Sequence, residues 1–237
     1  MNIRGMIRFS MVDFPGKIAC VVFCARCNFR CPFCHNPHLV LDPDSQPRVR
    51  MPQILHFMQS RVGKLEGIVI SGGEPTLDPE LPGFAKQMTD MGFAVKLDTN
   101  GSHPEILKSL YEAGCLHALG IDYKAPSGKY NEIANSGISD IADRVKRSLA
   151  FALENHIRLD VRTTVHKNLL SFEDLQTMRS ELNSIGVKDW NLQQFNPVDT
   201  LDEAISKTPT YSELELISFA RKLSSTKVRG LTGIYLE

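Results

Sequence analysis

Residues 18–36 read IACVVFCARCNFRCPFCHN and combine a short apolar run with closely spaced cysteines. The run Ile18–Phe23 has the length of a buried strand, and the cysteines follow it directly. Cys27, Cys31 and Cys34 have the spacing CxxxCxxC. Such dense clustering is typical of metal or redox chemistry, because a disulfide scaffold spreads its cysteines along a short secreted chain. Three thiolates are one fewer than a closed four-iron cluster takes, so a cluster held here would keep one iron open.

Cys24 leaves a second interpretation open. Cys24-x2-Cys27 and Cys31-x2-Cys34 also form two CxxC pairs, as in a four-thiolate zinc site or a closed electron-transfer cluster. Zinc sites of this kind usually separate their pairs by about 15–20 residues, far more than here. Cys24 also ends an apolar run, where a free cysteine commonly packs as a small hydrophobic residue. We therefore expect Cys27, Cys31 and Cys34 to be the cluster ligands. Cys20, Cys24 and Cys115 are expected to be buried packing residues.

Beyond this region the chain alternates short apolar runs with helix-like stretches. The six candidate strands are Ile18–Phe23, Gly67–Ile70, Ala94–Asp98, Leu116–Asp122, Ile157–Thr164 and Trp190–Gln194. The six candidate helices are Pro52–Arg61, Glu80–Met91, Pro104–Ala113, Ser139–Asn155, Ser171–Ile185 and Ser212–Leu223. This alternation indicates βαβ units and a parallel sheet. Six units are too few for a closed eight-fold barrel, so the sequence predicts one α/β domain over residues 1–237, built as a partial, open parallel (β/α)6 barrel.

Polar or Gly-rich residues follow nearly every candidate strand. Because parallel α/β folds place their chemistry at the carboxyl ends of the strands, we expect these residues to form one shared site with the cysteines. They are, in strand order, Gly72, Gly73 and Glu74, then Asp98, then Asp122 and Lys124, then Arg162 and His166, then Gln194. Arg162 lies within an apolar strand and needs a carboxylate partner, either a ligand or a protein acid.

The overall composition excludes several classes of protein. Lys and Arg number 27, as do Asp and Glu, so the basic excess of a nucleic-acid-binding protein is missing. No apolar run approaches the ~20 residues that a membrane-spanning helix needs. The first residues lack the apolar core and cleavage site of a signal peptide. We therefore expect a cytoplasmic protein that binds neither nucleic acid nor membrane.

The motifs VDFPGK, CNFRCPFCHNP, SGGEP, LDTNG and IDYK resemble those of the radical S-adenosylmethionine (SAM) superfamily. Within it, they are most similar to the glycyl-radical-enzyme activases, especially the activating proteins of anaerobic ribonucleoside-triphosphate reductase; pyruvate formate-lyase activases are near relatives. The similarity extends from about Asp13 to Asn196. The chain departs from the family at Ala25-Arg26, where these activases have a Gln-Gly pair before the first cluster cysteine.

The resemblance implies a radical SAM domain with a [4Fe-4S] cluster on Cys27, Cys31 and Cys34, in a cluster loop over residues 24–36. It implies reductive cleavage of SAM and formation of a glycyl radical on a partner enzyme, with flavodoxin or ferredoxin as a low-potential electron donor. The alternatives are a small-molecule radical SAM enzyme, similar to 7-carboxy-7-deazaguanine synthase, and an iron–sulfur or zinc binding module without catalysis. Residues 198–237 are assigned to the same domain, with 198–209 either a lid or a connection.

The same resemblance implies which residues contact SAM. Phe33 would meet the adenine, Glu74 the methionine amine, and Arg162 the carboxylate. Asp98 and Asp122 would contact SAM and are also candidates for holding a monovalent cation. The full set of expected SAM contacts is Phe33, His35, Gly72, Gly73, Glu74, Asp98, Asp122, Lys124, Arg162, His166 and Gln194.

Overall fold

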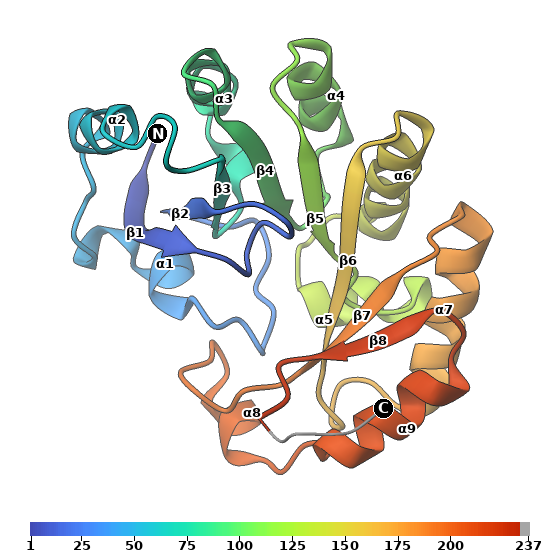
Figure 1. Ribbon diagram of the computed structural model, residues 1–237. Helices are drawn as coiled ribbons and strands as arrows, with labels where there is room; N and C mark the ends of the chain where they lie inside the picture. The colour runs from blue at the N-terminus through green and yellow to red at the C-terminus, as the bar shows by residue number, and fades with distance from the viewer. Residues whose placement is uncertain (233–237) are drawn as a thin grey trace.

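The chain folds around a single eight-stranded sheet with the strand order β1-β2-β3-β4-β5-β6-β7-β8, as the computed structural model of residues 1–232 shows (Figure 1). The strands are β1 Ile3–Ser10, β2 Ala19–Cys24, β3 Gly67–Gly72, β4 Ala94–Thr99, β5 Ala118–Asp122, β6 Arg158–Val165, β7 Trp190–Gln194 and β8 Thr226–Arg229. β1 is antiparallel to β2, and every later neighbour is parallel. β1 and β8 form the two edges, so the barrel is open.

The prediction of an open parallel barrel is confirmed, and its six expected strands correspond to β2–β7. The structure adds β1 and β8, which the sequence did not reveal. β1 does not alternate regularly between buried and exposed residues, and it joins the sheet by pairing with β2. This pairing is a contact between separate segments, so the local sequence of β1 does not reveal it. β8 is four residues long, and Val228 is its only apolar residue.

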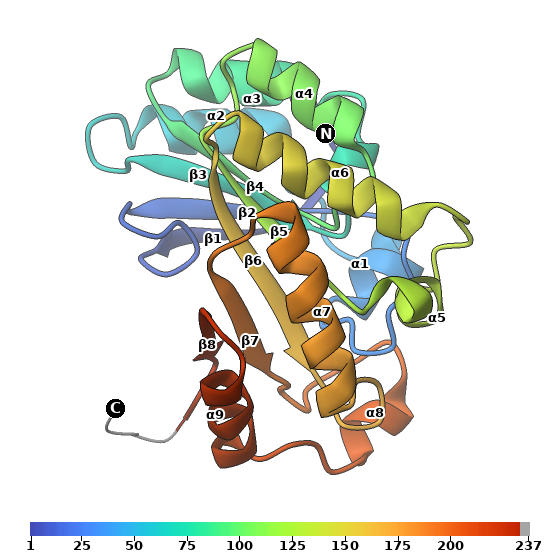
Figure 2. The same ribbon diagram turned by 90° about the vertical axis from the view of Figure 1, so that its right-hand side faces the viewer.

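Nine helices are present in the described part of the chain. They are α1 Pro37–Leu41, α2 Met51–Gln59, α3 Leu81–Asp90, α4 Pro104–Glu112, α5 Tyr130–Ala134, α6 Ile141–Glu154, α7 Phe172–Ile185, α8 Glu203–Lys207 and α9 Glu213–Lys222. The longer ones cover the convex face of the sheet, while α1, α5 and α8 lie at the carboxyl ends of the strands (Figure 2). Ser171 and Ser212 each cap a helix by accepting a backbone hydrogen bond three residues on. No helix of residues 1–232 is long and apolar enough to cross a membrane.

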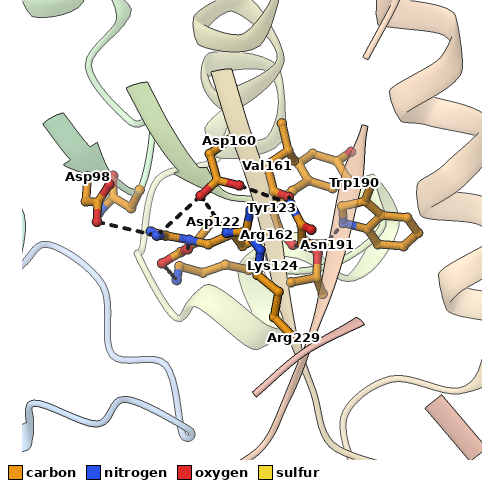
Figure 3. Close-up of polar contacts among 12 residues, drawn as sticks. Asp98, Asp122, Tyr123, Lys124, Asp160, Val161, Arg162, Trp190, Asn191 and Arg229 are labelled. Atoms are coloured by element: carbon orange, nitrogen blue, oxygen red, sulfur yellow. Dashed lines mark hydrogen bonds and ion pairs between the residues drawn. The ribbon is translucent and has the colours of Figure 1, made fainter. Parts of the chain in front are cut away.

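The main core fills the space between the sheet and the helices. Successive strand residues point to opposite faces, so alternate residues of each strand enter this core. Trp190 on β7 is fully buried there and donates its indole N–H to Thr163 Oγ1 at 2.9 Å. The Thr163 hydroxyl in turn donates to the carbonyl of Tyr123, so these three residues join β5, β6 and β7 (Figure 3).

The concave face of the sheet is divided into two parts of different character. On the β2–β3 side it is apolar, with Phe14 packed over Val21 and Val69. From β4 onward the same face carries charged side chains, including Asp98, Asp122 and Arg162 (Figure 3). Residues paired across parallel strands share a face, so the register predicts which side chains meet at the carboxyl ends of the strands.

Candidate functional site

A cavity of about 280 Å³ lies at the carboxyl ends of β3–β7, between the strand ends and the cluster loop. It brings together eleven of the fourteen predicted site residues. These are Cys27, Cys31, Phe33, Cys34, His35, Gly72, Gly73, Asp98, Asp122, Lys124 and Arg162. The shared site expected from the strand ends is therefore present in the fold, and the cysteine loop forms one of its walls.

The cluster loop is held in place mainly by backbone hydrogen bonds to distant segments. Arg26 donates to the carbonyl of Leu39 at 2.7 Å, and Arg30 to that of Ala134 at 2.9 Å. The segment 198–209, which includes α8, also contacts the loop: Leu201 N donates to Cys34 O at 3.2 Å, and Asp202 N donates to Pro32 O at 3.0 Å. This segment therefore packs against the loop as well as connecting β7 to α9.

The donor set of the loop fits a multi-iron cluster. Cys27, Cys31 and Cys34 all line the cavity. Among residues 1–232, no three His, Cys, Asp or Glu side chains converge closely enough to hold a single metal ion. Three thiols on one cavity are the ligand number expected for a four-iron cluster that keeps one iron open. Cys27 Sγ also accepts hydrogen bonds from Phe29 N (3.4 Å) and from the side-chain amide of Asn100 (3.9 Å), the kind of contact that tunes cluster sulfurs.

Burial opposes ionisation of these thiols in the absence of metal. It raises the pKa of Cys27 to about 12 and that of Cys31 to about 11. Thiolates are the ligand form, so iron bound in the cavity must supply the positive charge that stabilises them. Cys24 differs from the three: it is 1% exposed within β2, does not line the cavity, and has its pKa raised by burial. Its position fits the expected packing role.

Gly72 and Gly73 join the end of β3 to the cluster loop at very short range. A Cβ on Gly73 would lie 1.9 Å from the carbonyl oxygen of Arg26, and one on Gly72 would lie 2.3 Å from the backbone nitrogen of Cys24. Gly72 also has a φ of +117°, which side chains rarely tolerate. Two backbone bonds seal the contact, from Gly73 N to Cys24 O and from Glu74 N to Arg26 O, both 2.8 Å. The glycine pair therefore fixes the position of the loop.

Glu74 lies beside the cavity but is not among the residues that line it. Its side chain is 1% exposed. Oε1 accepts hydrogen bonds from the backbone N–H (3.0 Å) and hydroxyl (2.5 Å) of Thr76 and from the hydroxyl of Thr99 (2.6 Å), while Oε2 accepts one from Asn100 N (2.7 Å). In this structure Glu74 ties the end of β3 to the end of β4 behind the cavity wall, and its expected contact with the methionine amine of SAM stays a prediction.

Replacing Glu74 with glutamine is expected to lower the free energy of unfolding by about 2–3 kcal/mol. All four partners donate, so the amide nitrogen of glutamine must face at least one donor, whichever way it is turned. Urea denaturation of the metal-free protein measures the effect. Unchanged stability combined with weakened SAM binding would instead support a direct ligand role.

Arg162 has protein acids as carboxylate partners, one of the two possibilities that the sequence left open. Its guanidinium lies 3.1 Å from Asp122 Oδ1, 3.4 Å from Asp98 Oδ2 and 3.8 Å from Asp160 Oδ2 (Figure 3). The expected SAM carboxylate is therefore not needed to pair this buried charge, although Arg162 still lines the cavity. A second cation serves each acid: Lys96 pairs with Asp98, Lys124 with Asp122, and Arg229 with Asp160.

Within this ionic network, the pKa values of Asp122 and Lys124 are shifted toward the charged forms. Burial alone would raise the pKa of Asp122, but Arg162 and Lys124 hold it below its usual value. Burial alone would lower the pKa of Lys124, yet Cys31 and Asp122 outweigh it and raise that pKa. Lys124 Nζ also lies 5.4 Å from the ring centre of Phe33, which places a cation beside an aromatic wall of the cavity.

His166 and Gln194 lie outside the cavity. His166 is fully buried, packs edge-on against Phe195 at 4.9 Å, and has its Nε2 3.4 Å from the carbonyl of Thr208. Gln194 donates its amide N–H to the carbonyl of Tyr211 at 2.9 Å. In this structure both residues connect the sheet to the segment before α9, and their expected contacts with SAM stay predictions.

Several cavity residues were missed by the sequence. Gln193, rather than Gln194, faces the cavity, because Thr164 pairs in register with Gln193 and the two share the face of Arg162. Alternation along β6 from Arg162 could have revealed Thr164. Which residues of β7 face the cavity depends on how β7 pairs with β6, and the sequence does not give that register. The other missed lining residues are Phe29, Asn36, Val40, Ser71, Thr99 and Asn100.

Comparison with known proteins agrees with this geometry. The chain matches the profile of the Radical SAM superfamily over residues 21–177. It is 30% identical over 217 residues to a protein of Methanocaldococcus jannaschii that is named, provisionally, as a glycyl-radical enzyme activating enzyme; the match covers 90% of this chain and 88% of the relative. It is 31% identical to the pyruvate formate-lyase-activating enzyme of Clostridium pasteurianum over 138 residues, which cover 54% of this chain and 58% of that enzyme.

Among solved structures, the fold is similar to that of Streptococcus suis SuiB bound to S-adenosylmethionine. The TM-score is 0.67 at 13% identity, over 90% of this chain and 50% of SuiB, so the chain spans about half the length of that protein. At this identity the likeness supports the fold alone. The family profile and the M. jannaschii relative carry the assignment further. The chain is a radical SAM enzyme, and it belongs within that superfamily to the glycyl-radical-enzyme activating group.

Proposed function

We propose that this protein cleaves SAM reductively and uses the product to place a glycyl radical on a partner enzyme, which we take to be anaerobic ribonucleoside-triphosphate reductase. The observation that carries the proposal is the convergence of exactly three cluster-type cysteines with the polar ends of β3–β7 on one cavity. The similarity to activating enzymes over 90% of the chain supports the choice of a protein substrate.

Cys27, Cys31 and Cys34 would hold a [4Fe-4S] cluster, which the family implies together with SAM. When bound and reduced by a donor such as flavodoxin or ferredoxin, a cluster with one open iron supplies the electron that breaks the S–C5′ bond of SAM, giving methionine and a 5′-deoxyadenosyl radical able to take a hydrogen atom from a glycine Cα. The chain itself binds and orients the reactants and keeps water away from them.

Each wall of the cavity has a role in that binding. Gly72 and Gly73 let the backbone at the end of β3 approach the methionyl end of SAM closely. Lys124 and Arg162 also line the cavity and provide fixed positive charge suited to the methionyl carboxylate. Phe33 is 6% exposed and offers an apolar surface for the adenine. His35 stacks against Phe195 with ring centres 5.7 Å apart at the rim, and burial lowers its pKa, which favours a neutral ring.

The test is a glycine-centred radical on the partner. Anaerobic incubation of the reconstituted, reduced enzyme with SAM and anaerobic ribonucleoside-triphosphate reductase is expected to give a doublet in the EPR spectrum of the reductase. Substituting alanine for the radical-bearing glycine of the reductase should remove the doublet, and pyruvate formate-lyase as an alternative substrate tests the choice of partner. Turnover of a small molecule with no radical on either protein would contradict the activase proposal.

A further inference from the structure

The two aspartates expected to hold a monovalent cation already face side-chain cations on every oxygen. Asp98 Oδ1 is paired with Lys96 Nζ, and Asp98 Oδ2 lies 3.4 Å from Arg162. Asp122 Oδ1 lies 3.1 Å from the same guanidinium, and Asp122 Oδ2 lies 3.6 Å from Lys124 Nζ. The carboxylate oxygens that would bind a cation are therefore already paired with ammonium and guanidinium groups of the protein.

We infer that this protein binds SAM without a monovalent cation, and that Lys96 supplies the positive charge that such an ion would bring. The inference rests on the proposed SAM site and corrects the expectation of a cation at Asp98 and Asp122. It makes Lys96 a positioning residue, since it acts on the cavity only through Asp98.

Lys96 lies on β4 next to Asp98, with which it forms an ion pair. It is 1% exposed and lies two residues before Asp98 on the concave face. Its neighbours in the adjoining strands, Val69 and Ala118, are small and apolar. Among residues 1–232, Asp98 is the one acid with which it forms an ion pair. Removing one partner of a buried ion pair is strongly destabilising, so Lys96 holds the Asp98 side chain in place.

Gly120 on β5 makes this pairing sterically feasible. It lies opposite Asp98 in the parallel register. A Cβ at this position would lie 2.2 Å from Asp98 Oδ1 and 3.2 Å from Lys96 Nζ. The strand thus leaves open, beside the carboxylate, the space that the lysine head group and the aspartate share.

The charge balance also disfavours an added ion. Lys96, Lys124 and Arg162 carry three positive charges against the two of Asp98 and Asp122, a net charge of +1. Including Asp160 and its second partner Arg229 leaves the balance at +1. Each of these carboxylates already has cationic partners, so an added ion would have to displace a side-chain cation, whereas the carboxylate group of SAM would meet positive charge already in place.

Titration of SAM into the reconstituted holoenzyme by anaerobic calorimetry tests the inference. Potassium chloride is compared with tetramethylammonium chloride at the same ionic strength, because tetramethylammonium is too large to bind between carboxylates. The wild-type dissociation constant is expected to change by less than about twofold between the two salts. A saturable, roughly tenfold gain in affinity with potassium would overturn the inference. Absence of SAM binding in both salts would instead overturn the proposed SAM site itself.

Lys96→Gln and Lys96→Arg form the matched pair of variants. Lys96→Gln is expected to bind SAM about tenfold more weakly in tetramethylammonium and to recover most of that loss in potassium, because the ion can then take the vacated place beside Asp98. Lys96→Arg keeps the charge and should stay close to wild type in both salts. A Lys96→Gln protein that folds and binds SAM normally in both salts would contradict the role of Lys96. The wild-type titration decides the cation question by itself if Lys96→Gln does not fold.

Discussion

Replacing any one of Cys27, Cys31 or Cys34 with alanine is expected to reduce reductive cleavage of SAM by at least about 100-fold, since changes behind the ligands of a metal site already cost 10–100-fold. All three thiols line the same cavity, and no fourth cysteine does. Losing one leaves a cluster without enough protein ligands to be retained. Iron and acid-labile sulfide content, together with 5′-deoxyadenosine formed by the dithionite-reduced protein, measure the effect.

Cys24→Ala is the matched control, because it removes a thiol from the same stretch of chain without touching the cavity. Cys24 is buried in β2, and its loss should cost about 1 kcal/mol of stability through the small void that it leaves. The variant should keep its cluster and most of its SAM cleavage. Loss of iron from Cys24→Ala at normal stability would mean that the metal centre is closed by a fourth protein ligand, as in the zinc-type or electron-transfer interpretation.

Gly73→Ala is expected to be nearly as damaging, although it changes no ligand. The new methyl group would overlap the carbonyl of Arg26, whose backbone leads directly into Cys27. A carbonyl in a hydrogen-bonded loop cannot give way as a flexible side chain can, so the loop itself must shift. We expect a loss of about 3 kcal/mol or more in the free energy of unfolding and a protein that retains little iron. Denaturation of the metal-free protein and iron analysis after reconstitution separate the two effects.

Gly83→Ala provides the comparison for that variant. Gly83 lies inside α3, where an added Cβ meets no atom within 4 Å. Alanine is the better helix former, so this change should stabilise the protein by about 0.5–1 kcal/mol and leave iron content unchanged. If Gly73→Ala behaved like Gly83→Ala, the close contact between the end of β3 and the cluster loop would not be what positions Cys27.

The sequence predicted those parts of the site whose signals are local. Cysteine spacing, the glycine pair and strand-end acids each occupy a few adjacent positions, and these residues line the cavity. It failed where the outcome depends on pairing across the sheet. The register of β7 against β6 determines that Gln193, and not Gln194, faces the cavity. The sequence of β7 alone does not give this register. The edge strands β1 and β8 were not predicted, because they too are defined by their pairing with neighbouring strands.

Charged residues in and beside the strand ends have protein partners that the sequence did not reveal. Glu74 is buried and Arg162 is partly buried, and each was expected to bind the ligand directly. In the fold, Glu74 is held by donors from the ends of β3 and β4, and Arg162 by acids from β4, β5 and β6. A single sequence shows that a buried charge needs partners, but it does not show whether those partners lie elsewhere in the chain.

The buried indole of Trp190 gives the protein a built-in optical reporter. It is the only tryptophan in the chain, and it joins β6 to β7 through Thr163, on the face of the sheet opposite the cavity. Its fluorescence emission should shift to longer wavelength when the part of the barrel around β6 and β7 unfolds and exposes the indole to water. Far-ultraviolet circular dichroism follows the whole sheet, so a difference between the two signals during denaturation would reveal whether the charged half and the apolar half of the barrel melt as one cooperative unit.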